Sequence, residues 1–446
     1  MTKETIQLLQ TALAALSVIL MGACGVRLLA RLIRLLAGRE TADGFSVNTI
    51  AEPSGAGKAP AAPGAPGRSA ALRGAGAREL VAAAAVTLAS RLAIYLLAYA
   101  MYRLLGVGDA GFSQSFVRLW RHWDTGEYLK IAQDGYTAVG DDRLMIVFFP
   151  LYPLLMRLAS PLVGGSVFYG GILVSLTCAS LAGALLYDLC ALQWDEKSAR
   201  LALAYWLLNP LSVFLGCVYT ESLFVCLTLA AVWLLRRGHP WQAALCGAAS
   251  AFSRMPGVIV AGLFLIRLLG EIPRGRANAR AVLRCVLQMG VVFSGLAAYW
   301  LVNYAVAGDP FIYMTYQAEN WYHHVAGFWD AVSTTAYYVL TRTAERSWLF
   351  LWVGQLLSMF YVFALLAAHE DRLPFDLAAY AFVYTAAVLG QTWLLSGARY
   401  LFALAPLAML QARAHRKAGV HAMLLACSGA LLIVWVYGFT IAAQVF

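Results

Sequence analysis

The residues best suited to chemistry lie in one polar and aromatic segment between two long apolar stretches. Residues 120–136 read WRHWDTGEYLKIAQDGY. A helical spacing of three and four residues would place several of these side chains on one face of a short helix, namely Trp120, Trp123, Asp124, Glu127, Tyr128 and Ile131. A carboxylate held beside aromatic rings at a membrane surface is costly to desolvate, which favours a task or a bound partner. The structural alternative is an aromatic-belt helix with solvated acids.

Two arginines farther along the chain are suited to a phosphate group. Arg254 follows Ser253 inside an apolar stretch, and Arg399 precedes Tyr400 at the expected start of a helix. A guanidinium group pairs with phosphate oxygens through two parallel hydrogen bonds, so Arg254 and Arg399 together would suit a lipid-linked phosphate. The alternative for Arg254 is an interfacial side chain that reaches the lipid headgroups.

Two further groups of residues offer binding functions on the same side of the membrane. Tyr219 and Glu221 lie in the turn YTES between two apolar stretches, where Glu221 alternatively serves only as a favourable acid at a helix N-terminus. Gln317 and Trp321 lie in the segment 308–324 and suit a sugar or a headgroup.

No metal site or cofactor is predicted from the sequence. His323 and His324 are neighbours and would point to different sides of a helix. The sequence contains no Walker A loop, no dinucleotide-binding glycine motif, no H-E-x-x-H and no G-x-S-x-G. Nucleotide-driven pumping and serine hydrolysis therefore lack support.

The composition defines the elements that must position these residues. Of the 446 residues, 61% are apolar and 13% are charged, whereas soluble domains are about half apolar and about a quarter charged. Apolar runs of about 20 residues recur, each long enough to cross a bilayer as a helix. The sequence thus predicts an all-α polytopic membrane protein and excludes a soluble enzyme and a secreted disulfide scaffold. The net charge of +10 comes largely from clusters at helix ends, which mark the cytoplasmic side and do not indicate nucleic-acid binding.

Placing these basic clusters inside divides the chain into three parts. We expect an N-terminal transmembrane helix within residues 1–45, a flexible Gly/Ala/Pro linker at 46–78 and a membrane domain at 79–446. About 12 crossings follow, with two long outer segments that bear interfacial helices, at 106–166 and 307–347.

Two apolar stretches need separate treatment. Residues 144–163 resemble a span, but a crossing there would move the basic residues 267–284 outside, so we expect a surface or re-entrant helix. Residues 240–270 lie between two inside signals and therefore cross twice. The sequence Met255-Pro256-Gly257 interrupts them, which predicts two half-length helices.

The ordered motifs resemble the PIG-V mannosyltransferases, which add the second mannose during glycosylphosphatidylinositol anchor assembly and have bacterial relatives. The matching blocks extend over roughly residues 80–410 and are HWD at 122–124, FFPLYP at 148–153, NP at 209–210, YTESLF at 219–224, SR at 253–254, GDP at 308–310 and RY at 399–400. The N-terminal helix and the linker lie outside this resemblance.

The resemblance implies a GT-C type helical bundle whose catalytic Asp lies in the first long outer loop. Asp124 would be the general base that deprotonates an acceptor hydroxyl, with inversion at the sugar and with lipid phosphate leaving. The expected partners are a polyprenyl-phosphate sugar donor (mannose first), a lipid or glycan acceptor and membrane lipids, at the outer face of a bacterial plasma membrane. The expected substrate-binding residues are His122, Trp123, Glu127, Tyr128, Tyr152, Tyr219, Glu221, Arg254, Gln317, Trp321, Arg399 and Tyr400.

Two other functions compete with this interpretation. A lipid or small-molecule transporter or flippase would line a path through both leaflets with polar groups. Here the polar clusters gather on one side, which favours an enzyme. The second is a GT-C enzyme that uses another polyprenyl-phosphate sugar, such as arabinose or glucose, which these residues fit equally well.

Overall fold

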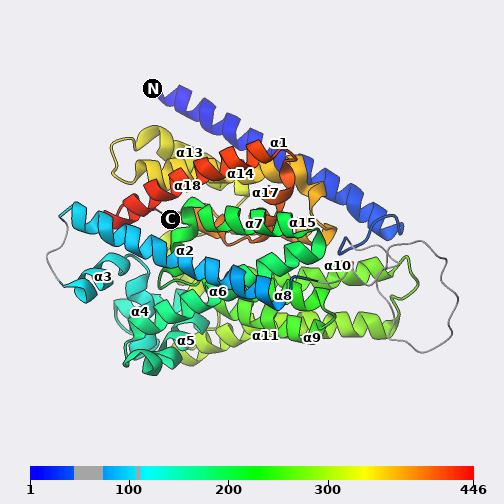
Figure 1. The fold of residues 1–446 in the computed structure, drawn as a ribbon, viewed down its shortest axis with the longest axis horizontal. Coiled ribbons are helices and arrows are strands. Elements are labelled where there is room, and N and C mark those ends of the chain that lie inside the picture. The colour runs from blue at the N-terminus through cyan, green and yellow to red at the C-terminus, as the bar shows by residue number, and fades with distance from the viewer. Residues whose placement is uncertain (45–73, 107–110, 446) are drawn as a thin grey trace.

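The computed structural model describes residues 1–44, 74–106 and 111–445. Within these ranges the regular structure is helical, and a single isolated bridge joins Val325 to Gln391. The long helices lie side by side along the longest axis of the molecule (Figure 1). The expected linker at 46–78 falls mostly outside the described residues, which resume at 74.

Six helical segments among the described residues are long and apolar enough to cross a membrane, and up to eight if each of two sharply bent pairs is one span. The six include α1 (Lys3–Leu36), α2 (Ala77–Leu104), α6 (Val167–Gln193), α11 (Ala279–Ala307) and α18 (Ala418–Thr440), together with the segment Trp348–Arg372 that contains α14 (Gly354–His369). The fold class expected from the sequence, an all-α polytopic membrane protein, is confirmed. The count of 12 crossings and the GT-C arrangement stay predictions.

Shorter helices fill the space between these spans. They are α7 (Glu196–Leu208), α8 (Glu221–Arg236), α9 (Pro240–Ser253), α10 (Ala261–Glu271), α13 (Phe328–Thr341), α15 (Phe375–Val388) and α17 (Pro406–Ala414). Helix α9 packs closely on α11, where a Cβ atom added to Gly295 would lie 1.9 Å from the carbonyl oxygen of Ala248. Small residues at such contacts let two membrane helices approach closely.

The two apolar stretches that were treated separately in the sequence are both irregular in the structure. Helix α9 ends at Ser253, Arg254 is extended, and the short helix η4 (Met255–Val260) leads into α10, which confirms the predicted break. The segment expected to be a surface or re-entrant helix consists of η1 (Asp141–Val147), α5 (Leu151–Ala159) and η2 (Ser160–Val163). Its two arms are bent by 102°, so it is not one straight span.

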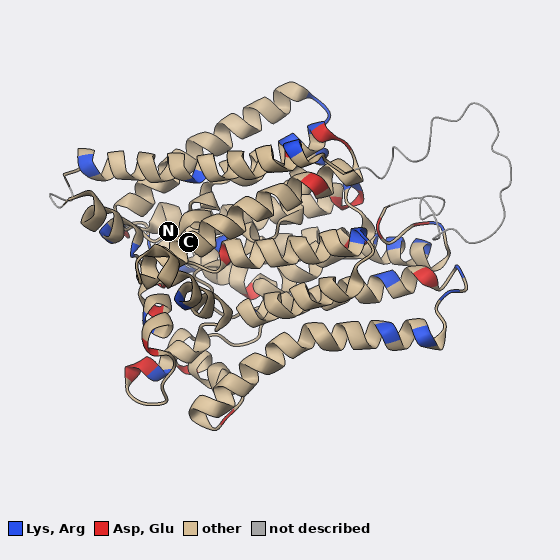
Figure 2. Cartoon of the chain, turned by 60° about the horizontal axis from the view of Figure 1, so that its bottom comes forward, with Lys and Arg blue, Asp and Glu red and all other residues tan. Residues whose placement is uncertain are grey.

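Charged residues mark two ends of the bundle. Helix α8 begins at Glu221 and ends at Arg236, about 22 Å along its axis at 1.5 Å per residue. The basic residues near the ends of α8 and α10 and the start of α11 therefore lie at the end opposite Glu221. Figure 2 shows Lys and Arg positions (blue) gathered at helix ends beside the long grey trace. The polar motifs of the sequence lie at the other end, with α4 (Thr125–Asp134) and α5 (Figure 1).

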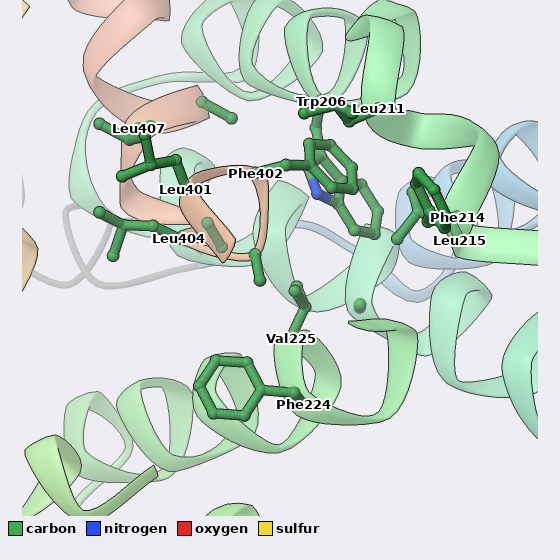
Figure 3. Packing of buried hydrophobic residues seen from close by; sticks show 14 of the residues in the cluster. Trp206, Leu211, Phe214, Leu215, Phe224, Val225, Leu401, Phe402, Leu404 and Leu407 are labelled. Atoms are coloured by element: carbon green, nitrogen blue, oxygen red, sulfur yellow. The ribbon is translucent and has the colours of Figure 1, made fainter. Parts of the chain in front are cut away.

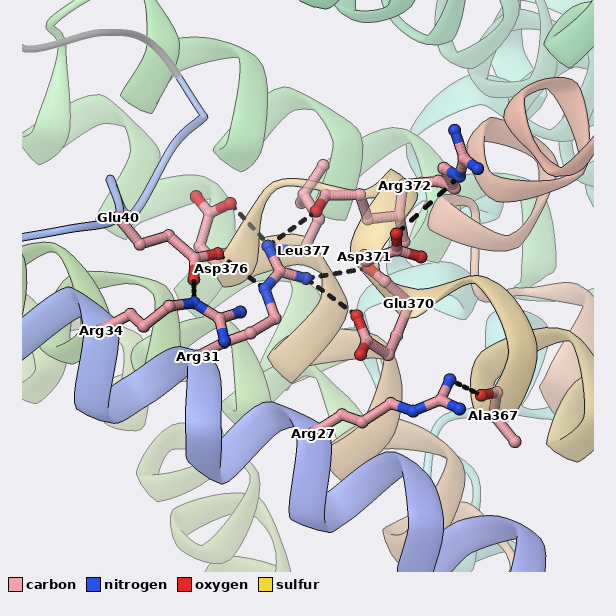
Figure 4. Close-up of polar contacts among 11 residues, drawn as sticks. Arg27, Arg31, Arg34, Glu40, Ala367, Glu370, Asp371, Arg372, Asp376 and Leu377 are labelled. Carbon is pink, nitrogen blue, oxygen red and sulfur yellow. Dashed lines mark hydrogen bonds and ion pairs between the residues drawn. The ribbon is translucent and has the colours of Figure 1, made fainter.

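A group of ion pairs, here called the distal network, lies at the basic end, and Figure 4 shows the part of it around Arg31. Arg31 of α1 donates to Glu40 at 2.6 Å and to Glu370 at 3.2 Å. Arg236 donates to both carboxylate oxygens of Asp376, at 2.6 and 2.8 Å. These five residues fasten α1 and α8 to α15 and to the turn before it.

Aromatic packing in the middle of the bundle holds the short helix α16 (Gly397–Phe402) in place. The rings of Trp206 and Phe402 stack with centroids 6.5 Å apart and planes 12° apart. Leu211, Leu401 and Leu404 are buried around them (Figure 3). Full burial of such side chains is worth about 1.5–3 kcal/mol each. This packing fixes the segment that carries Arg399.

Candidate active site

The chain is strained immediately before Asp124. Helix α3 (Phe112–Trp120) ends at Trp120, and Trp123 has a φ of +44°, a left-handed conformation that is uncommon for a bulky residue. Asp124 is the N-cap of α4 and forms no capping hydrogen bond with its side chain. Strain of this kind costs about 1–3 kcal/mol and tends to gather at functional sites.

The expectation of one continuous helix through 120–131 is therefore wrong. Trp120 belongs to α3 and is fully buried against Tyr95 and Phe439, whose ring centroids lie 4.7 and 4.9 Å away. It does not share a face with Asp124. Helix α4 ends at Asp134, where Gly135 has a φ of +81°, a conformation that glycine adopts readily.

Four charged side chains from distant parts of the chain form a row, here called the active-site network. Asp124 Oδ2 accepts hydrogen bonds from Nη1 and Nη2 of Arg399, at 3.2 and 3.1 Å. Nε of Arg399 lies 3.2 Å from Glu221 Oε1. The same oxygen accepts from Nη1 of Arg254 at 3.0 Å. Two acids and two guanidinium groups thus alternate, and their formal charges sum to zero.

Burial separates the members of this network. The side chain of Asp124 is 32% exposed, whereas those of Arg399, Arg254 and Glu221 are 6%, 11% and 1% exposed. Oε2 of Glu221 is buried and has no hydrogen-bond partner among the residues described. Asp124 is therefore the member most accessible to a substrate. Glu221, expected to bind substrate, is instead enclosed between two guanidinium groups and positions them.

Aromatic rings cover both guanidinium groups. Cζ of Arg399 lies 4.9 Å from the ring centroid of Tyr219, and Cζ of Arg254 lies 4.7 Å from that of Tyr400. The hydroxyl of Tyr219 donates to the backbone carbonyl of His122 at 3.2 Å, which ties this wall to the strained turn. A cation over an aromatic face is stabilised further where water is excluded.

Three expected binding residues lie on α4 or on the neighbouring helix α5. Tyr128 is buried, and burial, with a contribution from Asp124, raises the pKa of its phenol, so it stays protonated. Burial, then Asp124 and Asp142, raises the pKa of the half-buried Glu127. Tyr152 is fully buried and its hydroxyl bonds with the carbonyl of Gly171 and with a serine hydroxyl. Tyr152 therefore supports the wall and offers no hydrogen bond to a substrate.

The remaining expected residues divide between two places. The His122 ring lies 5.3 Å from the Trp123 ring, beside the network, and burial lowers the pKa of His122. Gln317 and Trp321 lie on α12 (Ile312–Trp321), which packs mainly on η1 and α11. The structure thus places α12 in a separate cluster from the ion pairs.

No sequence pattern indicated that Phe439 belongs to the site. This ring on α18 lies 5.3 Å from each of the rings of His122 and Trp123 and packs on Trp120. No local pattern connects an apolar residue of the last helix with a motif more than 300 residues earlier. Ser396, whose hydroxyl accepts from Arg399 Nη2 at 3.2 Å, was close enough in sequence to be suspected.

Across the described ranges, no group of three or more His, Cys, Asp or Glu residues is arranged to hold a metal ion. Transfer without a metal stays a prediction.

This geometry defines a helical membrane protein with an accessible carboxylate on a buried guanidinium network, and known proteins resemble the same part of the chain. Residues 107–321 match the family described as mannosyltransferase (PIG-V). GPI alpha-1,6-mannosyltransferase 2 of mouse is 32% identical over 171 residues, which are 36% of this chain and 33% of the relative. The human protein of the same name is 30% identical over 154 residues, 32% of this chain and 30% of the relative. No solved structure matches.

The chain spans about a third of the length of these curated relatives. The resemblance inferred from the motifs is confirmed: the chain is PIG-V-like over a segment that contains Asp124, Glu221 and Arg254. Arg399 lies beyond the matched segment, and the structure brings it back to Asp124.

Proposed function

We propose that this protein is a membrane mannosyltransferase that moves mannose from a polyprenyl-phosphate donor to an acceptor hydroxyl, with Asp124 as the general base. The observation that carries the proposal is the position of Asp124: partly exposed, next to a strained turn, and hydrogen-bonded by both Nη groups of Arg399. Similarity to PIG-V mannosyltransferases over 107–321 supports the sugar and the reaction class.

The transfer is a single displacement in this proposal. The acceptor oxygen forms a bond to the anomeric carbon while the bond from that carbon to the phosphate oxygen breaks. The lipid phosphate leaves with the electron pair, the acceptor proton passes to Asp124, and the configuration at the anomeric carbon inverts. A positioned general base contributes about 10²–10⁴-fold to such a rate.

The ion pair between Asp124 and Arg399 has a direct role in this scheme. The two Nη donors that hold Asp124 Oδ2 are also the fork that matches a phosphate. A donor phosphate that takes over this fork frees Oδ2 to accept the acceptor proton. Glu221 keeps hold of Arg399 through Nε and also holds Arg254, so the positive charge stays in place before the reaction begins.

The remaining assignments extend this scheme. The network lies opposite the basic ends of α8 and α10, and because Lys and Arg mark the cytoplasmic side, we place the site at the outer face of a bacterial plasma membrane. His122, Trp123, Glu127 and Tyr128 lie on the acceptor side of Asp124, where a lipid or glycan would enter. Gln317 and Trp321 of α12 would contact more distant parts of that acceptor.

The test is transfer by purified protein in lipid nanodiscs, with membrane glycolipid extract as the acceptor pool. Polyprenyl phosphates that carry mannose, glucose or arabinose are offered separately, and products are identified by their mass. Asp124→Asn is compared with Asp142→Asn, a nearby acid that pairs with Lys130 outside the network. We expect mannose transfer by the wild type and by Asp142→Asn, and none by Asp124→Asn.

Two results would overturn the proposal. Transfer by Asp124→Asn at the wild-type rate would show that Asp124 is not the general base. An untouched donor in every wild-type reaction, with translocation of labelled lipid across vesicles that contain the protein, would favour the flippase instead.

A further inference from the structure

One buried amide lies next to the segment that carries Arg399. Gln355 is the second residue of α14, and its side chain is fully buried. Helix α14 follows directly on η5 (Trp348–Val353), which is a π-helix. Short π-helical segments are rare and frequently lie at functional sites. Gln355 lies outside the segment 107–321 that matches the mannosyltransferase family, and the transfer scheme assigns it no part.

The Gln355 amide forms three hydrogen bonds that join three parts of the chain. Its Nε2 donates to the backbone carbonyl of Leu394 at 2.8 Å and to the hydroxyl of Thr335 on α13 at 2.9 Å. Its Oε1 accepts from the backbone N–H of Gly397 at 2.8 Å. Because a backbone carbonyl only accepts and a backbone N–H only donates, a single orientation of the amide satisfies both. Gln355 thus holds the backbone on both sides of Ser396.

The contact at Gly397 leaves no room for a side chain. A Cβ atom added there would lie 3.0 Å from Oε1 of Gln355 and 2.7 Å from Cδ2 of Leu394. The glycine therefore lets the amide of α14 reach the first residue of α16. Stacking of Phe402 on Trp206 holds the other end of this short helix. The start of α16 is held by hydrogen bonds and its end by apolar packing.

Arg399 moves with the segment that Gln355 holds. It lies two residues after Gly397, and its Nη2 donates to the hydroxyl of Ser396 at 3.2 Å. Helix α16 has only six residues, so a shift of its first turn displaces the arginine as well. The guanidinium group of Arg399 also contacts Asp124 and Glu221. The arrangement of the active-site network therefore depends on where this helix begins.

We propose that Gln355 is a positioning residue for the transfer, which fixes the start of α16 so that both Nη donors of Arg399 are in place before the donor phosphate arrives. The inference rests on the proposed function for the identity of that phosphate. Gln355 acts through Arg399 and not on the reacting atoms. A cation that is already in place lowers the barrier because no reorganisation is needed as charge develops. The alternative is a purely structural role, in which Gln355 only joins α13 to α14.

The first measurement compares two substitutions that remove different parts of this contact. Gln355→Met keeps an unbranched side chain and removes all three hydrogen bonds, whereas Thr335→Val removes only the bond to α13. We expect kcat/KM for the donor to fall about tenfold in Gln355→Met and to stay near the wild-type value in Thr335→Val, because a small misplacement of a positioned group strongly lowers the rate. Equal kcat/KM values in the two variants, or an equal rise in the KM of the acceptor, would overturn the proposal.

The second measurement tests whether Gln355 acts through Arg399. Gln355→Met is combined with Arg399→Lys, and the donor kinetics of the double variant are compared with those of each single variant. We expect little further loss in the double variant, because two residues that act through one contact have non-additive effects. A loss of the same size in both backgrounds would make the role of Gln355 purely structural.

The third measurement needs neither a variant nor turnover. Hydrogen exchange of the wild type in nanodiscs, without substrate, is followed in peptides that contain Gly397. We expect these peptides to exchange slowly compared with the exposed turn at 342–346. Exchange as fast as in that turn would show that the start of α16 is not held in place and would overturn the proposal. Failure of transfer with every donor would overturn the proposed function instead, and the exchange result would still stand.

Discussion

The bundle contains two sets of arginine–carboxylate pairs, one at each end, and they differ in how completely they are satisfied. In the distal network, Arg236 and Asp376 share two hydrogen bonds, and their side chains are 5% and 7% exposed. In the active-site network, the carboxylate of Asp124 is 32% exposed and one oxygen of Glu221 lacks a hydrogen-bond partner among the described residues. Among the described residues, only the second lies beside a left-handed residue that is not glycine, namely Trp123.

The difference teaches that a buried ion pair does not by itself indicate function. Desolvation offsets most of what such a pair gains, so its presence reveals little about its purpose. A pair closed on all sides, like Arg236 with Asp376, holds helices together. In the active-site network, by contrast, one carboxylate is accessible and the guanidinium groups beside it are buried, an arrangement that allows a bound anion to replace the carboxylate.

The largest predicted effect is a pair of opposite outcomes: a substitution in the active-site network lowers turnover, whereas one in the distal network lowers Tm. Asp124→Asn should lower turnover by about 10²–10⁴-fold with little change in Tm, because the side chain is exposed and Asn keeps its shape. Asp376→Asn should lower Tm and leave turnover per folded molecule unchanged. Transfer assays and thermal unfolding of both variants in one detergent give the comparison. A similar loss of Tm in the two variants would contradict it.

The next effect concerns the carboxylate that holds two arginines. Glu221→Gln leaves two buried guanidinium groups with only Asp124, and removing one partner of a buried pair costs about 3–5 kcal/mol. The control is Glu196→Gln, which breaks an exposed pair with Arg200 worth less than about 1 kcal/mol. Thermal unfolding of both variants tests the ranking. Equal stability would show that Glu221 does not anchor the network.

A smaller effect is expected when Arg399 loses the paired Nη donors that are proposed to bind the phosphate. Arg399→Lys should reduce kcat/KM for the donor by about 10–100-fold, since a hydrogen bond between charged groups is worth about 1.5–3 kcal/mol. The KM of the acceptor should change little. Arg236→Lys in the distal network provides the control and should leave donor kinetics intact. An equal change for donor and acceptor would make Arg399 a purely structural residue.

A modest pH dependence should come from His122. Burial lowers its pKa, so the folded protein keeps the ring neutral at a pH where the unfolded chain takes up a proton. Stability should therefore fall as the pH drops below about 6.5, the ordinary value for histidine. Unfolding of the wild type and His122→Gln between neutral and mildly acidic pH measures this. An identical pH slope in the variant would contradict the assignment.

The smallest predicted effect is that of a chelator. In the proposed scheme the phosphate-linked sugar is already activated, and Arg399 and Arg254 would supply positive charge at the leaving group. Transfer in excess EDTA should match the untreated reaction. Loss of transfer, with recovery on added Mg²⁺ or Mn²⁺, would assign the metal a role.

The sequence predicted the features that depend only on short stretches of the chain. Hydropathy predicted the membrane bundle, and the break at Met255-Pro256-Gly257 and the stop at Gly135 follow from backbone conformations that those residues impose. Arg254 and Arg399 were expected to share one site, and both in fact hold Glu221.

Other features depend on contacts that no local pattern encodes. The conformation of Trp123 is set by packing against the last helix, so periodicity alone predicted a helix where the chain turns. The enclosure of Glu221 depends on Arg254 and Arg399 from later helices, and the burial of Tyr152 depends on contacts with α4 and α6 on either side of it in the sequence. Residue type indicated these side chains as neighbours of a site, which stays a prediction, and it could not assign which of them meet a substrate.

The most direct test of the account measures donor binding and transfer in the same Asp124→Asn preparation. Labelled mannosyl polyprenyl phosphate is titrated against wild type and variant in nanodiscs, followed by a single-turnover reaction with acceptor. The account predicts that the variant binds the donor at least as tightly as the wild type, because Arg399 no longer has to exchange a carboxylate for the phosphate, and yet transfers no mannose. Loss of donor binding together with transfer, or transfer at the wild-type rate, would contradict the role of Asp124 as the base.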